Sequence, residues 1–119
     1  MYPFPTASDL QFLVGKTLEH VRLGFWQFEF VFEKGSINVE GEFEHVDSQG
    51  VVRGHNTGVN RLAPIYVHHI PGQTVTTASV EPFCLTLAFG RGDLLRIYSN
   101  EGQFACGQIY DDEGRLIPF

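Results

Sequence analysis

The chain has 119 residues, a formal net charge of −6, a hydrophobic share of 43% and two cysteines. A chain of this length has room for one well-buried core, so we expect a single domain over residues 1–119. The acidic balance disfavours nucleic acid as a partner. No apolar run approaches the ~20 residues that cross a membrane, and the first residues lack the features of a secretory signal. Two cysteines make no disulfide framework, so a cytoplasmic location is expected.

The first part of the chain is expected to form a short helix followed by three strands. Residues 7–14 fit a helix that ends at Gly15, since glycine readily adopts the left-handed conformation that closes a helix. Alternating apolar and polar residues then predict strands at about 16–23, 26–33 and 36–46. The alternation on the second strand assigns to its buried face Trp26, Phe28, Phe30 and Phe32.

The rest of the chain repeats this order. The segment Asp47 to Arg61 is rich in Gly and Asn and is expected to be the longest irregular stretch. A second short helix is expected from Pro64 to about His69. The strands expected after it lie at about 73–80, 83–89 and 94–99, and a C-terminal hairpin follows at 103–110 and 115–118.

Two segments of the chain resemble each other at an offset of 57 residues. The identical pairs are Gly15 and Gly72, Thr17 and Thr74, Phe32 and Phe89, and Gly35 and Gly92. The hydrophobic positions between them also match, which predicts an internal repeat over about 7–46 and 63–99. The alternative is that any two β-meanders share such a pattern. The expected fold is mainly β (α+β), an antiparallel sandwich or open barrel built from two α-β-β-β halves plus a C-terminal hairpin.

An acidic face is expected on the outer side of the first three strands. Tight turns at Gly24-Phe25 and at Lys34-Gly35 would place both His20 and Glu40 opposite Glu29. The candidate binding residues on this face are Glu29, Glu40, Glu42, Glu44, His20 and Arg22. Such a face suits a basic protein partner, because complementary charge speeds association.

Other chemistry is weakly indicated by the sequence. The Glu29–Glu40 pair with His20 could serve acid/base chemistry or hold a hard cation, but an exposed sheet face excludes no water. His45 and His55 could meet in space, but no Cys or Asp spacing supports a zinc site. The chain has no phosphate-binding loop and no recognisable nucleophile elbow. We therefore predict no catalytic residue, no metal site and no cofactor.

Two runs of the chain resemble a known family. The run LVGKTLEHVRLGFWQFEFVFEKGSINVEG and the closing run GQFACGQIYDDEGRLIPF are similar to a family of small bacterial β-rich proteins of unknown function. The resemblance implies a β-rich fold and a bacterial cytoplasmic origin, and it carries no known active site. Some small acidic bacterial proteins of this kind look similar to immunity proteins, whose acidic faces cover the basic sites of toxins.

Three functions from different classes follow as hypotheses. The first is a non-catalytic protein-binding module that uses the acidic face. The alternative is a small-molecule-binding or enzymatic β-barrel with a pocket under the 47–61 loop, lined by inner aromatic residues such as Trp26. The third is a homodimer joined through a sheet edge or through exposed aromatic residues.

Overall fold

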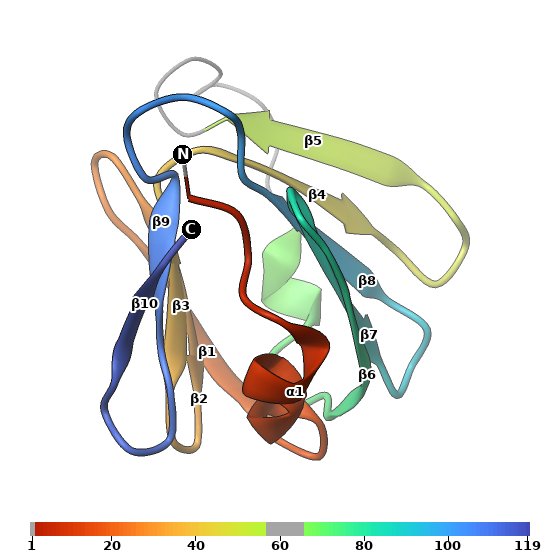
Figure 1. The fold of residues 1–119 in the computed structure, drawn as a ribbon. Coiled ribbons are helices and arrows are strands. Elements are labelled where there is room, and N and C mark those ends of the chain that lie inside the picture. Colours follow the sequence, from red (N-terminus) through yellow and green to blue (C-terminus); the bar gives the residue numbers. More distant parts are fainter. Residues whose placement is uncertain (1, 57–65) are drawn as a thin grey trace.

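The protein forms two antiparallel five-stranded sheets, which Figure 1 shows on opposite sides of the molecule. The computed structural model describes residues 2–56 and 66–119. In spatial order, the first sheet contains β1 (Leu18–Leu23), β2 (Phe28–Phe32), β3 (Ser36–Val39), β9 (Gly107–Tyr110) and β10 (Leu116–Pro118). The second sheet contains β5 (Val52–Asn56), β4 (Glu42–Val46), β8 (Leu94–Tyr98), β7 (Cys84–Phe89) and β6 (Val75–Glu81). The predicted mainly β, antiparallel two-sheet fold is therefore confirmed.

Short helical turns precede each set of three strands. The predicted helix 7–14 is α1 (Ala7–Leu10) followed by the 3-10 turn η1 (Gln11–Leu13), and Gly15 takes a φ of 87° at its end. In Figure 1, α1 lies between the two sheets at the lower end of the molecule. Of the predicted second helix, the described part is one 3-10 turn, η2 (Val67–His69), and residues 64 and 65 lie outside the described residues. The helices of the described ranges are too short to cross a membrane.

The predicted strand 36–46 is wrong as a single element. The chain leaves the first sheet after Val39 and enters the second sheet at Glu42. At the crossing, the backbone N–H of Glu40 donates to the carbonyl of Cys106. A Cβ on Gly41 would lie 3.3 Å from the Cβ of Cys106, so the residue at this position has to be small. At the crossing the chain thus lies against a distant segment, a contact that no local pattern encodes.

The middle segment is more regular than expected. Within the predicted irregular stretch 47–61, residues 52–56 form β5, and residues 57–61 lie outside the described residues. The turn before β5 is fixed by Asp47, whose Oδ1 accepts the backbone N–H groups of Gln49 and Val51. Of the predicted strand 103–110, only residues 107–110 are in a strand.

The two sheets have the same pairing scheme. Leu18 lies opposite Phe32 in the first sheet and Val75 lies opposite Phe89 in the second, and each pair is followed by an irregularity of one residue. The hydroxyl groups of Thr17 and Thr74 lie 3.1 Å apart where β1 and β6 begin. Equivalent residues of the two sheets thus meet where these strands start, and the internal repeat itself stays a prediction.

Each sheet is completed by a hairpin from the other half of the chain. The β4–β5 hairpin follows the first three strands along the chain but pairs with β8, and the β9–β10 hairpin pairs with β3. The matching rows are Ile37–Ile109–Ile117 in the first sheet and Leu95–His45–Arg53 in the second. Every strand of one sheet therefore has a counterpart in the other.

The core lies between the sheets. Phe28, Phe30 and Phe32 are buried as predicted, as are the inward residues of β3. The prediction for Trp26 is wrong, since this side chain is 60% exposed. The reason is that β2 begins only at Phe28, after a turn closed by the hydrogen bond from the N–H of Gly24 to the carbonyl of Gln27.

Candidate functional site

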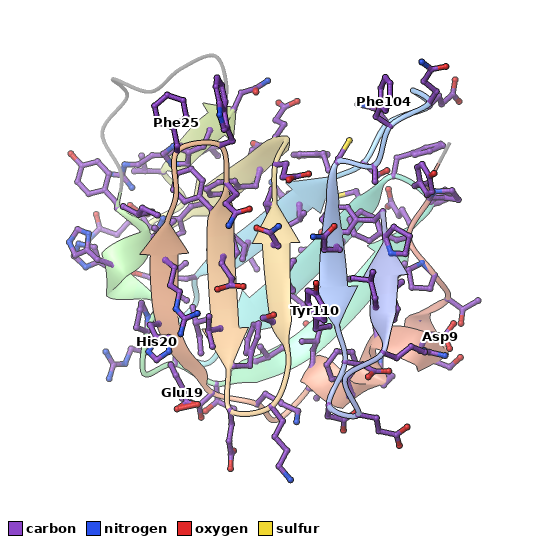
Figure 2. The ribbon with its side chains drawn as sticks, turned by 90° about the vertical axis from the view of Figure 1, so that its left-hand side faces the viewer. Asp9, Glu19, His20, Phe25, Phe104 and Tyr110 are labelled. Carbon is purple, nitrogen blue, oxygen red and sulfur yellow. The ribbon has the colours of Figure 1, made fainter. Side chains whose placement is uncertain are left out.

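The residues of the predicted acidic face lie on two different sheets. His20, Arg22 and Glu29 are on the first sheet, and Figure 2 shows His20 on its outer side. Glu42 and Glu44 are on β4 in the second sheet, and Glu40 lies where the chain crosses from the first sheet to the second. A single continuous acidic stripe is therefore not formed.

The predicted strand registers were wrong by two residues. Glu29 lies opposite Asn38 rather than Glu40, and its partner on β1 is Arg22 rather than His20. The cause lies in the two turns. The N–H of Gly24 donates to the carbonyl of Gln27, which leaves Phe25 and Trp26 as the loop residues, and the N–H of Phe32 donates to the carbonyl of Gly35, which leaves Glu33 and Lys34. Hairpin register follows from the turn, so this shift moves every later pair.

Several of these charges already have partners. Arg22 Nη1 lies 3.2 Å from Glu29 Oε1. The hydroxyl of Tyr98 donates to Glu44, and burial together with this bond raises the pKa of Tyr98 to about 12. Glu40 and Glu42 are exposed, and neither forms an ion pair with a residue of the described ranges. The exposed negative charge of the predicted face is thus concentrated at these two residues.

A polar cavity of about 430 Å³ lies between the inner face of the second sheet and η2. Its residues come from the β4–β5 hairpin, from η2 together with Tyr66 before it and the segment after it, and from the β7–β8 turn. The lining residues are His45, Asp47, Ser48, Gln49, Arg53, Tyr66, His69, Gln73, Arg91 and Asp93. A cavity of this size falls within the range of ~300–1,000 Å³ that is usual for small-molecule sites.

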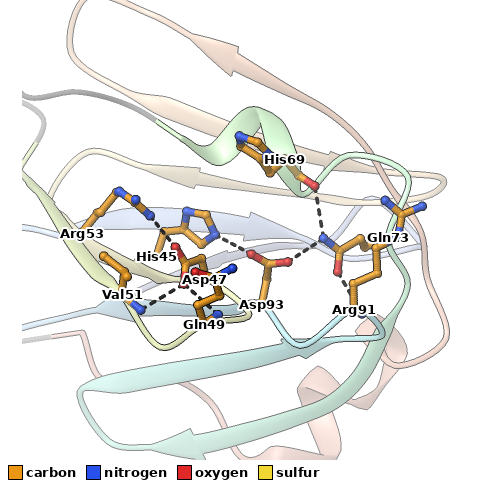
Figure 3. Close-up of polar contacts among 9 residues, drawn as sticks. All are labelled: His45, Asp47, Gln49, Val51, Arg53, His69, Gln73, Arg91 and Asp93. Carbon is orange, nitrogen blue, oxygen red and sulfur yellow. Dashed lines mark hydrogen bonds and ion pairs between the residues drawn. The ribbon is translucent and has the colours of Figure 1, made fainter.

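Three buried polar side chains of the lining, those of His45, Gln73 and Asp93, are joined by hydrogen bonds (Figure 3). Asp93 Oδ1 lies 2.8 Å from His45 Nε2, and Asp93 Oδ2 accepts a hydrogen bond of 2.7 Å from Gln73 Nε2. Gln73 Oε1 accepts the backbone N–H of Arg91, and Gln73 Nε2 also donates to the carbonyl of His69. A buried network whose members have several partners holds its side chains in one arrangement.

The wall formed by the β4–β5 hairpin is held by a second cluster. Arg53 Nη1 donates to Asp47 Oδ2 at 2.9 Å, and the guanidinium lies 4.0 Å from the ring centroid of Tyr66. The hydrogen bond from the Val51 N–H is the largest cause that lowers the pKa of Asp47, and Arg53 lowers it further. The Arg53 side chain is thus fixed between a carboxylate and an aromatic ring.

His55 is a second buried imidazole of the second sheet. It lies on the inner face of β5, 4% exposed, with its ring 4.9 Å from that of Phe43. Burial is the largest cause that lowers the pKa of His55, and the nearby His45 and Arg53 lower it further. Within residues 2–56 and 66–119, no group of three or more His, Cys, Asp or Glu side chains is placed to hold a metal ion.

Sequence reasoning located the cavity only in part. The alternative hypothesis expected a pocket under residues 47–61, and residues 47–53 do supply part of its lining. Trp26, expected in that lining, is not there. The network was not predicted, because its three side chains come from segments of the chain that lie far apart in the sequence. One signal is present in the sequence: His45 lies two residues after the apolar Phe43, so in a strand the two side chains share one face, and an apolar residue marks that face as the inner one.

Comparison of the chain with known protein families, curated proteins and solved structures finds no match. The family resemblance noted from the sequence therefore stays a prediction. Function has to be argued from the cavity and its charges.

Proposed function

We propose that the protein binds a small anionic molecule, a carboxylate or a phosphate ester, in the cavity of the second sheet. The observation that carries this proposal is the distribution of unused hydrogen-bonding groups around the cavity. The carboxylates of the lining already accept bonds from the protein, whereas its guanidinium groups have donors to spare.

The carboxylates are largely satisfied by internal donors. Asp93 is held by His45 and Gln73, and Asp47 is held by two backbone N–H groups and Arg53. Two hydrogen bonds on Asp93 and three on Asp47 occupy half or more of the about four acceptor positions that a carboxylate has. These acids therefore shape the cavity and do not make it a cation site.

The arginines supply the free donors. A guanidinium has five N–H donors in a rigid fork. Arg53 uses Nη1 on Asp47, and the exposed side chain of Arg91 forms no ion pair with any residue of the described ranges. Arginine donors form charge-assisted hydrogen bonds to carboxylate or phosphate oxygens, often in bidentate geometry. An anion of small-molecule size thus complements what the cavity leaves open.

A second candidate function is the predicted interaction with a basic protein. It is supported by the exposure of Glu40 and Glu42, two acids separated by one residue at the crossing between the sheets. The split of the predicted face leaves this surface smaller than the sequence indicated. The cavity therefore supports the stronger proposal.

Isothermal titration calorimetry with succinate and with inorganic phosphate tests the proposal. We expect saturable binding of at least one of the two anions at millimolar concentration or below. Arg91→Gln should weaken it by about tenfold, which corresponds to ~1.4 kcal/mol for one charge-assisted contact. Arg22→Gln is the matched control, because it removes an exposed arginine from the outer face of the first sheet. Binding that is absent for both anions, or that both variants weaken equally, contradicts the proposal.

A further inference from the structure

The most exposed large apolar side chains of the described ranges gather at one end of the first sheet. Each of these four side chains is at least 60% exposed, and they are Leu23, Phe25, Trp26 and Phe104. β1 ends at Leu23, the β1–β2 turn carries the next two rings, and Phe104 lies shortly before β9. Because β3 ends between the starts of β2 and β9, these segments share one end of the sheet, and Figure 2 shows Phe25 and Phe104 there.

Negative charge lies at the same end of the sheet. Glu40 directly follows β3, and its backbone N–H donates to the carbonyl of Cys106 in the segment before β9. Three described segments at this end contain three exposed acids and no lysine or arginine; the segments are 23–28, 39–42 and 100–107, and the acids are Glu40, Glu42 and Glu101. The exposed rings therefore share this end with carboxylates that these segments do not neutralise.

Exposed aromatic rings and carboxylates together complement organic cations. The rings of Phe25 and Trp26 contact each other edge to face, with their centroids 4.6 Å apart, and form one apolar unit. A guanidinium group is attracted to the face of such a ring, and its planar fork also donates to carboxylate oxygens. Aromatic side chains are also enriched among the residues that dominate binding at protein interfaces. The chemistry of this end thus fits a partner segment that carries arginine side chains.

Two other occupants complement this surface less well. A second copy of the chain in a symmetric dimer would place the same acids against themselves, because a two-fold interface joins identical surfaces. Like charges that meet across an interface repel each other. An anionic lipid surface has a negative potential, which repels the same carboxylates. A basic segment of another protein has neither disadvantage.

We propose that Phe25, Trp26 and Phe104 bind an arginine-rich segment of a partner protein, whose guanidinium groups lie on these rings and bond to Glu40. None of these residues lines the cavity of the second sheet, so the inference is independent of the anion site. It assigns the predicted interaction with a basic protein to one end of the first sheet, and it adds aromatic contacts to the exposed acids.

The single tryptophan of the chain gives a direct test, since its fluorescence reports on this surface alone. Hexa-arginine and hexa-citrulline are matched peptide probes, because the ureido group of citrulline has nearly the shape of guanidinium but no charge. We expect hexa-arginine to change the emission of Trp26 saturably. Hexa-citrulline should bind about tenfold more weakly, because it keeps the shape and loses the attraction to rings and carboxylates.

Variants then locate the binding surface, with fluorescence anisotropy of labelled hexa-arginine as the measurement. Phe25→Ala and Phe104→Ala should each weaken binding about 2- to 5-fold, as expected for one exposed contact between a cation and a ring. Leu116→Ala is the matched control, because it removes an exposed apolar side chain at the start of β10. Glu40→Gln should weaken binding more than Glu113→Gln, which makes the same change in net charge in the β9–β10 turn.

Four outcomes would overturn the proposal. Equal binding of hexa-arginine and hexa-citrulline would show that cations are not recognised. Equal weakening by Phe25→Ala and Leu116→Ala would show that the rings are not the contact. A response of Trp26 to phosphatidylcholine vesicles but not to hexa-arginine would assign the surface to lipid. A dimer in light scattering that Phe25→Ala dissociates would assign the surface to a second copy of the chain.

Discussion

The two sheets share one pairing scheme but differ in what their inner faces hold. The β9–β10 hairpin completes the first sheet, and the β4–β5 hairpin completes the second. Ile109 and Ile117 of the first hairpin occupy the positions that His45 and Arg53 occupy in the second. The side chains of the first sheet pack into the core, and those of the second surround a polar cavity. The same backbone arrangement can thus hold either a packed core or a polar cavity, depending on a few inward positions.

The turn between the second and third strands explains part of the difference. In the first sheet the loop after Phe32 has two residues and closes at Gly35, whereas the loop after Phe89 has three and closes at Asp93. A Cβ on Gly35 would lie 2.8 Å from the carbonyl oxygen of Tyr110 and 3.2 Å from the ring of Phe12. No side chain fits there, while the second sheet accommodates a carboxylate and its partners.

The largest expected effect comes from removing the carboxylate that distinguishes the second sheet. Asp93→Ala leaves His45 and Gln73 buried without their acceptor, so we expect the free energy of unfolding to fall by ~3–5 kcal/mol. Urea denaturation measures this change. The exposed Asp112→Ala should change stability by less than ~0.5 kcal/mol, and an equally small effect at Asp93 would show that the network is not structural.

A smaller loss is expected when a side chain is added to the corresponding turn of the first sheet. Gly35 has a φ of 107°, and its Cβ would collide with backbone, so Gly35→Ala should cost ~2–4 kcal/mol. Gly92→Ala shares the positive φ but meets Ser48 at 3.5 Å, an ordinary contact, and should cost ~1–2 kcal/mol. Thermal and urea unfolding compare the two. Equal losses would contradict the steric difference between the turns.

The buried imidazole of β5 predicts a pH dependence that the first sheet lacks. The counterpart of His55 in the first sheet is Phe119, which lies opposite Gly107 in the same way as His55 lies opposite Phe43. The pKa of His55 is lowered below its ordinary 6.5 in the folded state, so below pH 6.5 the unfolded chain binds the proton first. Stability is therefore complete above pH 6.5 and falls as the pH drops toward the folded pKa, by at most ~1.4 kcal/mol per pH unit.

His55→Phe, which installs the residue of the first sheet, should remove this slope in urea unfolding curves recorded between pH 7.5 and 5. His20→Gln, at an exposed position, is the control and should leave it unchanged. Persistence of the slope in His55→Phe would assign it to another group. Asp47, whose pKa is lowered in the folded state, also reduces the stability when it is protonated, but it does so in a separate window at more acidic pH.

The smallest effect is expected at the exposed acids between the sheets. The double variant Glu40→Lys and Glu42→Lys should weaken salt-dependent binding of an oligolysine peptide by about threefold, with a change in stability below ~0.5 kcal/mol. Fluorescence anisotropy measures the binding. Asp112→Lys with Glu113→Lys makes the same change in net charge on the β9–β10 turn. Equal weakening by both double variants would mean that only net charge matters.

The sequence predicted where the strands lie better than it predicted which residues pair between them. Strand alternation identified the buried Phe30 and its neighbours, because one face of each strand had to be apolar. Register was missed because it depends on which residues close a turn, and a shift of one loop residue is invisible in alternation. The bond between His45 and Asp93 joins residues 48 positions apart, on strands whose adjacency no local pattern encodes.

Because the β9–β10 hairpin completes the first sheet, this sheet stays incomplete until the C-terminal part of the chain has been synthesised. When the ribosome has released everything up to β8, the second sheet has all its strands, but β3 still has one unpaired edge. That edge carries Ile37 and Val39, and its partner lies in residues 107–119. Exposed apolar strand edges invite pairing with other chains. A chain that lacks residues 107–119 is therefore expected to aggregate more readily than one that has them.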